Sequence, residues 1–392
     1  MSAPSLDLSA PTHDTPVDDL AIDAAPHTDL LATPAAHAGA DVFAERVLAA
    51  TLGALELAAI HAGDRLGWYR TLAEQGPVGS AELARATGTS ERYAREWLEH
   101  QAANGYVEVL PEDGTGARRF LLHAGVAEVM TDRDSLAHLA PLARLVAGTA
   151  RHVDALHEAY RTGGGVSWQQ LGADAREAQA ALNRPMFLHV LTQELLPQVP
   201  ALDARLRAGA LVADVGCGEG WSSVGLALGH PGVTVHGYDV DAASVEAARR
   251  HASSAGVAER VRFTLGDAAR TTRAAGTRYD VVTAFECLHD MPDPVGVLRS
   301  MREVTAEDGW VVVMDERTED ALEAPAGPVE RLLYGFSLVC CLPDGLAHEG
   351  GVGTGTVMRP PTLERYAREA GFSGVEVLPV EHDMFRFYRL HL

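Results

Sequence analysis

LVADVGCGEGWSS, residues 211–223, is the stretch of sequence that decides the fold. It is typical of an apolar strand that ends at Asp214, a turn with glycine at every second position, and the start of a helix. The glycines of the turn are Gly216, Gly218 and Gly220. They would let a bound molecule approach the backbone N–H groups at the start of the helix. A dinucleotide-binding turn would carry glycine where this chain has Trp221, so the match to that class is imperfect, and a tight connection without a ligand is the alternative.

Two further strands end in an acidic residue. VTVHGYDVD, residues 233–241, carries Asp239, which follows Asp214 by 25 residues, and VRFTLGDAA, residues 261–269, carries Asp267. An acid at the end of the second strand is suited to accept both hydroxyls of an unphosphorylated ribose. Because short apolar strands alternate with helices from the first strand onward, we predict a doubly wound α/β domain with these acids along one crevice.

The composition excludes several partners and kinds of chemistry. The chain has 392 residues and a formal net charge of −22, and no basic block offsets that charge locally, so nucleic acid is not expected as a partner. All 32 basic residues are arginine, which excludes a phosphate-loop lysine and a lysine nucleophile. No apolar run approaches a membrane span and no secretory signal is visible, so we expect a cytoplasmic protein without a membrane partner. The 4 cysteines show no paired C-x-x-C spacing and are predicted to be free thiols.

The sequence predicts four successive parts. Residues 1–40, rich in Ala, Pro, Asp and Thr, are typical of a disordered acidic tail. Residues 41–134 contain a helix-turn-helix pattern and two short strands, which together outline a winged helix. Residues 135–205 are predicted to be bridging helices that cover the site, and residues 206–392 form the α/β domain.

The second helix of the helix-turn-helix does not suit DNA. SERYAREWLEHQAANG, residues 90–105, sets Arg92 and Arg95 against three glutamates, a balance of 2 − 3 = −1, whereas contact with phosphate needs an excess of positive charge. A packing or dimerisation role is therefore favoured over DNA binding. The apolar breadth of residues 41–76 leads us to expect a homodimer formed through this domain.

Three motifs, DVGCGEG (214–220), GYD (237–239) and GDA (266–268), together closely resemble those of the class I S-adenosylmethionine-dependent methyltransferases. The resemblance spans roughly residues 211–392 and implies a mostly parallel, seven-stranded, Rossmann-like sheet. It also implies S-adenosylmethionine as cofactor and S-adenosylhomocysteine as product. An acidic crevice suits that cofactor, which carries a sulfonium and an ammonium but no pyrophosphate.

The resemblance assigns the cofactor contacts. The glycine turn should bracket the methionine part of the cofactor, Asp214 should lie beside its amino group, and Asp239 should hold the ribose. Asp267 should meet the adenine amino group. The remaining expected contacts are Val240 and Ala268, which flank the adenine ring, and Phe285.

YDVVTAFECLHDM, residues 279–291, runs from the fourth strand into His289. Small-molecule O-methyltransferases with an N-terminal winged-helix dimerisation domain carry a similar L-H-D element, and the resemblance implies that His289 takes a proton from the attacking hydroxyl. Imidazole suits that role because its ordinary pKa of ~6.5 lies near working pH. The alternative is that His289 only caps or packs the following helix. Glu316, at the end of the fifth strand, is the candidate to orient the histidine or bind substrate, and an ordinary polar strand end is its alternative.

The acceptor pocket is expected between the bridging helices and the segment that joins the fifth and sixth strands. Its candidate lining residues, each of which could instead be core, are Tyr160, Trp168, Met186, Phe187, His189, Tyr334, Phe336 and Met358. No metal is expected, because catechol-type enzymes hold magnesium with clustered Asp and Asn, and this chain has asparagine only at Asn104 and Asn183.

The sequence thus predicts methyl transfer to a small molecule of secondary metabolism, with a hydroxyl oxygen as the favoured target. N- or C-methylation is one alternative. A ligand-sensing helix-turn-helix regulator is another.

Overall fold

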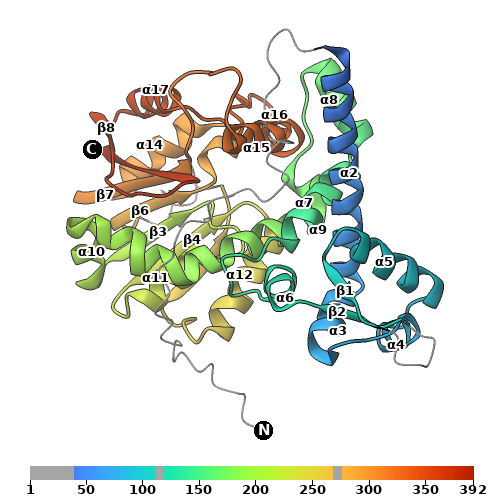
Figure 1. Ribbon diagram of the computed structural model, residues 1–392. Helices are drawn as coiled ribbons and strands as arrows, with labels where there is room; N and C mark the ends of the chain where they lie inside the picture. The colour runs from blue at the N-terminus through green and yellow to red at the C-terminus, as the bar shows by residue number, and fades with distance from the viewer. Residues whose placement is uncertain (1–38, 112–117, 268–275) are drawn as a thin grey trace. The chain divides into compact units, whose positions relative to one another are not determined.

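The computed structural model describes residues 39–111, 118–267 and 276–392 (Figure 1). The predicted tail up to residue 38 and the predicted cofactor contact Ala268 lie outside this part of the chain. The described residues divide at Leu52 and Gly53 into two compact units. Within the described ranges, no helix is both long enough and apolar enough to cross a membrane.

A seven-stranded sheet lies at the centre of the second unit, in the order β5-β4-β3-β6-β7-β9-β8. Its strands are β3 (Leu211–Val215), β4 (Thr234–Asp239), β5 (Val261–Leu265), β6 (Tyr279–Phe285), β7 (Thr305–Glu316), β8 (Gly374–Val377) and β9 (Phe385–His391). Neighbours are parallel from β5 through β7, and β9 is antiparallel to β7 and β8. The predicted mostly parallel, doubly wound sheet is confirmed. The strand order reverses direction between β3 and β6, and ligands of such sheets bind beyond the strand ends at that point.

Helices cover both faces of the sheet (Figure 1). Those on one face are α10 (Pro200–Arg207), α11 (Trp221–Gly229) and α12 (Ala242–Ser254), and those on the other are α14 (Pro294–Val304) and α17 (Pro360–Ala370). Successive side chains of a strand point to opposite faces of the sheet. Val212 of β3 therefore packs into the core beneath α10, α11 and α12, whereas Ala213 and Val215 pack into the core beneath α14 and α17. By the same alternation, Asp214 lies on the side of α11.

The winged-helix part has its own core. After α2 (Ala40–Arg65), its elements are α3 (Trp68–Gln75), α4 (Ser80–Thr87), α5 (Glu91–Ala103), β1 (Val107–Val109), β2 (Phe120–Leu122) and α6 (Ala124–Thr131). Tyr69 is buried there beside Trp97 and donates its hydroxyl to Gln101 Oε1 at 2.5 Å. The predicted helix-turn-helix is confirmed. Gly79 is the N-cap of α4, and the Glu82 side chain reaches back to accept the Gly79 N–H at 2.8 Å.

The segments around the predicted crevice consist of more, and shorter, helices than the sequence indicates. The bridging segment consists of α7 (Ala140–Ala150), α8 (Val153–Thr162), α9 (Trp168–Pro185), η1 (Met186–Leu195) and η2 (Leu196–Gln198). Pro185 has no backbone N–H to donate, and directly after it the chain winds more widely, as the π-helix η1. The segments after β6 and β7 are η3 (Leu288–Asp290), α15 (Pro328–Phe336), η4 (Ser337–Cys341) and α16 (Leu342–Leu346).

Candidate active site

The glycine-rich turn after β3 adopts a backbone conformation with positive φ angles, which glycine allows. Gly216, Gly218 and Gly220 have φ values of 67°, 51° and 80°, a region that other residues rarely adopt. A Cβ on Gly216 would lie 2.7 Å from Cys287 Sγ, whereas a Cβ on Gly218 would meet nothing within 4 Å. Gly218 therefore leaves open space beside its backbone, as a turn that cradles a ligand requires.

Asp239 lies at the end of β4 and is tied to this turn. Its carboxylate accepts hydrogen bonds from the backbone N–H groups of Gly218 and Asp241, both at 2.8 Å. Burial raises its pKa. Each carboxylate oxygen still has a lone pair, so the pair can accept two further hydroxyls. Leu265 pairs with Asp239 in the sheet, which brings the strand end before Asp267 alongside.

The remaining expected cofactor contacts differ in exposure. Val240 is 70% exposed and Asp267 is also exposed. Phe285, in contrast, is 6% exposed and stacks on Phe187 with 6.1 Å between the ring centroids. Asp267 and Val240 thus follow neighbouring strand ends, whereas Phe285 is packed in the core.

Asp214 is 1% exposed and lies beneath the turn. Its carboxylate accepts the hydroxyls of Ser222 and Ser223 at 2.6 Å and that of Thr283 at 2.8 Å. Burial raises its pKa. These bonds fasten the start of α11 to the adjacent strands β3 and β6. That Asp214 lies beside the amino group of the cofactor stays a prediction.

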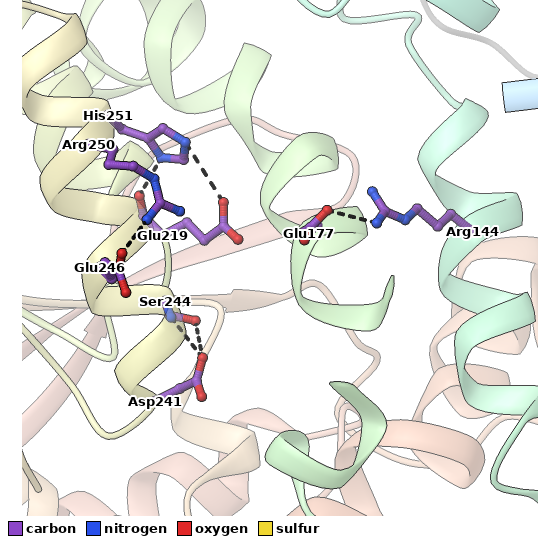
Figure 2. A network of polar contacts seen from close by, with 8 residues as sticks. All are labelled: Arg144, Glu177, Glu219, Asp241, Ser244, Glu246, Arg250 and His251. Carbon is purple, nitrogen blue, oxygen red and sulfur yellow. Dashed lines mark hydrogen bonds and ion pairs between the residues drawn. The ribbon is translucent and has the colours of Figure 1, made fainter. Parts of the chain in front are cut away.

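Trp221 lies where a dinucleotide-binding turn has glycine, and aromatic packing fills that position. Its ring stacks on His251 of α12 with 4.1 Å between centroids, and Arg184 lies over it at 5.0 Å. The carbonyl oxygen of Glu219 accepts a hydrogen bond from His251 Nδ1 at 2.9 Å, and the two side chains face each other beside the turn (Figure 2). Burial raises the pKa of Glu219 to about 7. Helix α12 thus supports the turn from outside.

His289 lies in η3, directly after β6, and is 2% exposed. Its Nδ1 is hydrogen-bonded to Asp315 Oδ1 at 2.7 Å and lies 3.0 Å from Glu316 Oε2. Its Nε2 lies 3.3 Å from Asp290 Oδ1. The expected partner Glu316 is therefore close, but the hydrogen bond goes to Asp315, which the sequence interpretation did not select.

Three carboxylates set the charge of this histidine. Burial alone would lower the pKa of His289, but Asp290, Asp315 and Glu316 together raise it well above its ordinary value. The imidazolium in turn holds the pKa of Asp315 below its usual range, against the effect of burial. Burial raises the pKa of Glu316. The centre therefore favours a protonated histidine paired with an ionised Asp315.

Two further acids at this centre were missed by sequence reasoning. Glu286 has a φ of 51°, the one positive value outside glycine in the described chain, and its carboxylate accepts a hydrogen bond from Asn183 Nδ2 of α9. Burial raises its pKa to about 8. Asp344 Oδ1 accepts the Trp168 N–H at 2.6 Å, and burial, with Asp290 adding to it, raises the pKa of Asp344 to about 7. The sequence feature that could have indicated Glu286 as a site residue is its position between the end of β6 and the L-H-D element.

The eight candidate pocket residues do not form one group. Met186 and Phe187 are in the core of one sheet face, and Met358 is in the core of the other. Trp168 and Phe336 pack against a separate cluster that Cys341 also flanks. The three remaining side chains have polar partners: Tyr160 donates to Leu338 O, His189 lies 3.4 Å from Asp134, and Tyr334 accepts from Arg359.

Two sets of side chains have spacing that a metal ion would accept. Three ligand atoms lie within 4.8 Å of one another in His289, Asp315 and Glu316, and likewise in His289, Asp290 and Cys341. Both sets share one imidazole, whose Nδ1 is already hydrogen-bonded to Asp315. The expectation that no metal takes part stays a prediction.

The sheet order, the glycine turn and the acidic strand ends define a Rossmann-like methyltransferase fold. A sequence model described as a methyltransferase domain matches residues 206–333, and one described as an Rv2258c-like winged helix-turn-helix domain matches residues 53–131. The ubiquinone biosynthesis O-methyltransferase of Thiobacillus denitrificans is 31% identical over 186 residues, which cover 47% of this chain and 73% of that protein. The chain belongs to the class I S-adenosylmethionine-dependent methyltransferases, and S-adenosylmethionine is its cofactor.

Other relatives are similar over different extents. The 27-O-demethylrifamycin SV methyltransferase of Amycolatopsis mediterranei is 33% identical over 161 residues, 40% of this chain and 57% of that protein. The structure of mitomycin 7-O-methyltransferase superposes with a TM-score of 0.67 at 24% identity, covering 90% of this chain and 98% of that one. An O-methyltransferase from neocarzinostatin biosynthesis, solved with S-adenosylhomocysteine and 1,4-dihydroxy-2-naphthoic acid, gives 0.58 at 20% identity, covering 91% and 99%. These two structures show the same fold over nearly the whole chain.

Proposed function

We propose that this protein transfers the methyl group of S-adenosylmethionine to a hydroxyl oxygen of a small molecule, with His289 as the general base. The observation that carries the proposal is the 2.7 Å hydrogen bond between His289 Nδ1 and Asp315. The relatives above are O-methyltransferases by name, and small molecules are named for several of them. Fold and family therefore agree with the chemistry that the site supports.

The proposed cofactor contacts are the turn and the strand ends around it: Asp214, Gly216, Gly218, Gly220, Asp239, Val240, Asp267, Ala268 and Phe285. S-adenosylmethionine supplies an electrophilic methyl group on a positively charged sulfur. The open space beside Gly218 and the lone pairs of Asp239 fit a nucleoside with free ribose hydroxyls. The acidic crevice also suits the positive charge of the cofactor.

His289 has the arrangement of a base held by a carboxylate. When Nδ1 donates to Asp315, the lone pair of the neutral ring lies on Nε2. Nε2 would accept the proton of an acceptor hydroxyl while the methyl group passes from the cofactor sulfur to that oxygen, which leaves S-adenosylhomocysteine and an imidazolium. Glu316, 3.0 Å from Nδ1, supports the imidazolium that results. The main task of the remaining residues is to align the acceptor with the methyl group.

The acceptor is proposed to lie between the bridging helices and the segment of η4 and α16. Trp168 and Phe336 support this placement, because both flank the cluster that Cys341 also touches. Cys341 Sγ lies within 4.8 Å of a ligand atom of His289. Tyr160, Met186, Phe187, His189, Tyr334 and Met358 stay candidates for the outer lining.

Two proposals concern the organisation of the chain. The winged helix at 41–134, the bridging helices at 135–205 and the methyltransferase domain at 206–392 are proposed as its functional parts. We also propose a homodimer through the first of these, because α2 carries a row of exposed apolar side chains. They are Val42, Phe43, Val47, Leu48, Leu52 and Leu55.

Replacing the base tests the proposed function. With labelled cofactor and a panel of phenols and polyols, His289→Ala should lose turnover but bind S-adenosylhomocysteine as the unmodified protein does. The matched control is His123→Ala, which removes a half-exposed histidine of the winged helix. Equal turnover of His289→Ala at saturating cofactor would refute the role of base. Label found on a ring carbon of a phenol instead of on its oxygen would refute the hydroxyl assignment.

A further inference from the structure

Residues 163–167 join α8 to α9 and form the α8–α9 linker, which lies against α16. Within the linker, the N–H of Val166 donates to Pro343 O at 3.0 Å, and the Val166 side chain is 1% exposed. Directly after the linker, the N–H of Trp168 donates to Asp344 Oδ1 at 2.6 Å. Two hydrogen bonds, to segments far away in sequence, therefore fasten the start of α9 to α16.

Gly165 allows this close approach. A Cβ on Gly165 would lie 2.0 Å from Pro343 O and 2.3 Å from Ala347 N, which are both backbone atoms. A larger residue would therefore separate the linker from α16. A Cβ on the neighbouring Gly164 would meet only Thr162 Oγ1, at 3.4 Å. The linker thus requires glycine at one of these two adjacent positions and not at the other.

The contact continues from α16 to the proposed base. A Cβ on Gly345, the residue after Asp344, would lie 3.4 Å from Asp290 O, so α16 packs on η3. Directly before α16, Cys341 places its Sγ within 4.8 Å of a ligand atom of His289. The linker, α16 and the segment of the base therefore form one continuous packed region.

We propose that Gly165 and Asp344 are positioning residues, which hold the bridging helices against α16 and so fix the wall of the acceptor pocket that Trp168 contributes near His289. This inference rests on the proposed function, since it concerns the acceptor of that same site. Neither residue has to touch the acceptor. Asp344 acts through the oxygen that accepts the Trp168 N–H, and Gly165 acts by having no side chain.

Loss of this contact should affect the acceptor and not the cofactor. The turn at Gly218 is held by its own hydrogen bond to Asp239, on the other side of the crevice from α16. A displaced Trp168, in contrast, would leave the acceptor less tightly bound and less well aligned with the methyl group. The Michaelis constant for the acceptor is therefore the quantity that should change most.

Two matched pairs of variants test the proposal. Asp344→Ala removes the oxygen that accepts the Trp168 N–H, whereas Asp344→Asn keeps a carbonyl oxygen there and removes only the charge. Gly165→Ala forces the linker away from α16, whereas Gly164→Ala adds a methyl group that fits. Each full-length variant is assayed at saturating S-adenosylmethionine with the member of the panel of phenols and polyols that the unmodified protein methylates fastest.

Asp344→Ala and Gly165→Ala should each raise the KM for this acceptor by about tenfold and lower kcat less. Their amides at 163–171 should also exchange hydrogen faster. Asp344→Asn and Gly164→Ala should keep both quantities near those of the unmodified protein. All four should bind S-adenosylhomocysteine with unchanged affinity. The pairs are independent, so one suffices if a variant of the other does not fold.

A control separates positioning from a general loss of stability. Glu82→Ala removes the same kind of bond, from a backbone N–H to a carboxylate, in the winged helix, and should leave the KM unchanged. An unchanged KM in Asp344→Ala and Gly165→Ala, or a loss in Asp344→Asn as large as in Asp344→Ala, would overturn the proposal and leave the proposed function standing. If the unmodified protein methylated no member of the panel, the proposed function and this inference would both be overturned.

Discussion

Nδ1 of His289 lies 2.7 Å from Oδ1 of Asp315, and the two side chains are 3% and 1% exposed. The bond joins the segment after β6 to the end of β7, its parallel neighbour in the sheet. Because an ionised carboxylate can only accept, Nδ1 is the donor and carries the proton. A single buried contact thus decides which nitrogen of His289 is available to an acceptor.

Asp315→Asn should reduce kcat by about 100-fold or more, because an amide can donate to Nδ1 and so favour the wrong tautomer. Glu316→Gln is the matched comparison and should cost much less, since Glu316 is near Nδ1 but does not take its hydrogen bond. Steady-state kinetics at saturating cofactor measures both. A larger loss in Glu316→Gln than in Asp315→Asn would reverse the two roles.

Turnover should rise with pH well beyond the ordinary range of histidine. The three carboxylates raise the pKa of His289 despite its burial, and a base acts only in its neutral form, so kcat should increase as pH passes through the raised pKa. Asp290→Asn removes one of the raising charges and should move the midpoint to lower pH. A profile measured from about pH 6 to about pH 10 that is flat, or that Asp290→Asn leaves in place, would contradict this.

The same raised pKa affects stability. A group whose folded pKa exceeds its unfolded value of ~6.5 stabilises the fold fully below that value, and the contribution is lost as pH rises through the folded pKa. The free energy of unfolding should therefore fall with increasing pH above about 6.5 by more in the unmodified protein than in His289→Gln. Urea titrations at a series of pH values measure this difference.

The fold could be predicted because its signals are local. An apolar strand, a turn with alternating glycines and acids at strand ends are short patterns, and each is decided within a few residues of Asp214 or Asp239. The choice between Asp315 and Glu316 could not be predicted in this way. Both follow the same strand, and which one meets His289 depends on the geometry of the neighbouring β6.

Other parts of the site depend on packing between distant segments. Glu286 adopts a positive φ that its residue type does not favour, and its partner Asn183 is 103 residues away in sequence. Asp344 meets Trp168 across a separation of 176 residues. Aromatic and methionine residues in the sequence therefore gave candidates for the pocket. No pattern within one segment distinguishes Trp168, which contacts Asp344, from a core residue such as Met358.

Gly218→Ala should weaken cofactor binding by about tenfold or more without unfolding the protein. Its φ of 51° makes alanine cost about 1–2 kcal/mol, but the added Cβ would meet no protein atom within 4 Å, in the space proposed for the cofactor. Gly220→Ala should destabilise more, since its Cβ would lie 2.6 Å from Phe263 Cζ. Calorimetry with S-adenosylhomocysteine and urea unfolding separate the two effects. Unchanged cofactor affinity in Gly218→Ala would place the cofactor elsewhere.

Removing divalent metals should leave turnover unchanged. Nδ1 of His289 is hydrogen-bonded to Asp315. A metal ion between His289, Asp315 and Glu316 would have to displace the proton on Nδ1, and the hydrogen bond that orients the proposed base would be lost. Dialysis against EDTA followed by assay of transfer is the measurement, with zinc, magnesium and manganese added back singly. Loss of transfer that one of these metals restores would contradict the proposed base.

Charges on α2 should separate the proposed dimer. Leu48 and Leu52 are each 60% exposed and lie one helical turn apart, so a partner that covers one covers the other. Leu48→Glu with Leu52→Glu should convert the dimer to a monomer, because burying two carboxylates in an apolar contact is unfavourable. Light scattering measures the mass, and Tyr93→Glu, at a 74% exposed position of α5, is the control that should stay dimeric. A monomeric mass of the unmodified protein at concentrations of about 50 µM would end the proposal, because a stable dimer of the usual interface size would persist at such a concentration.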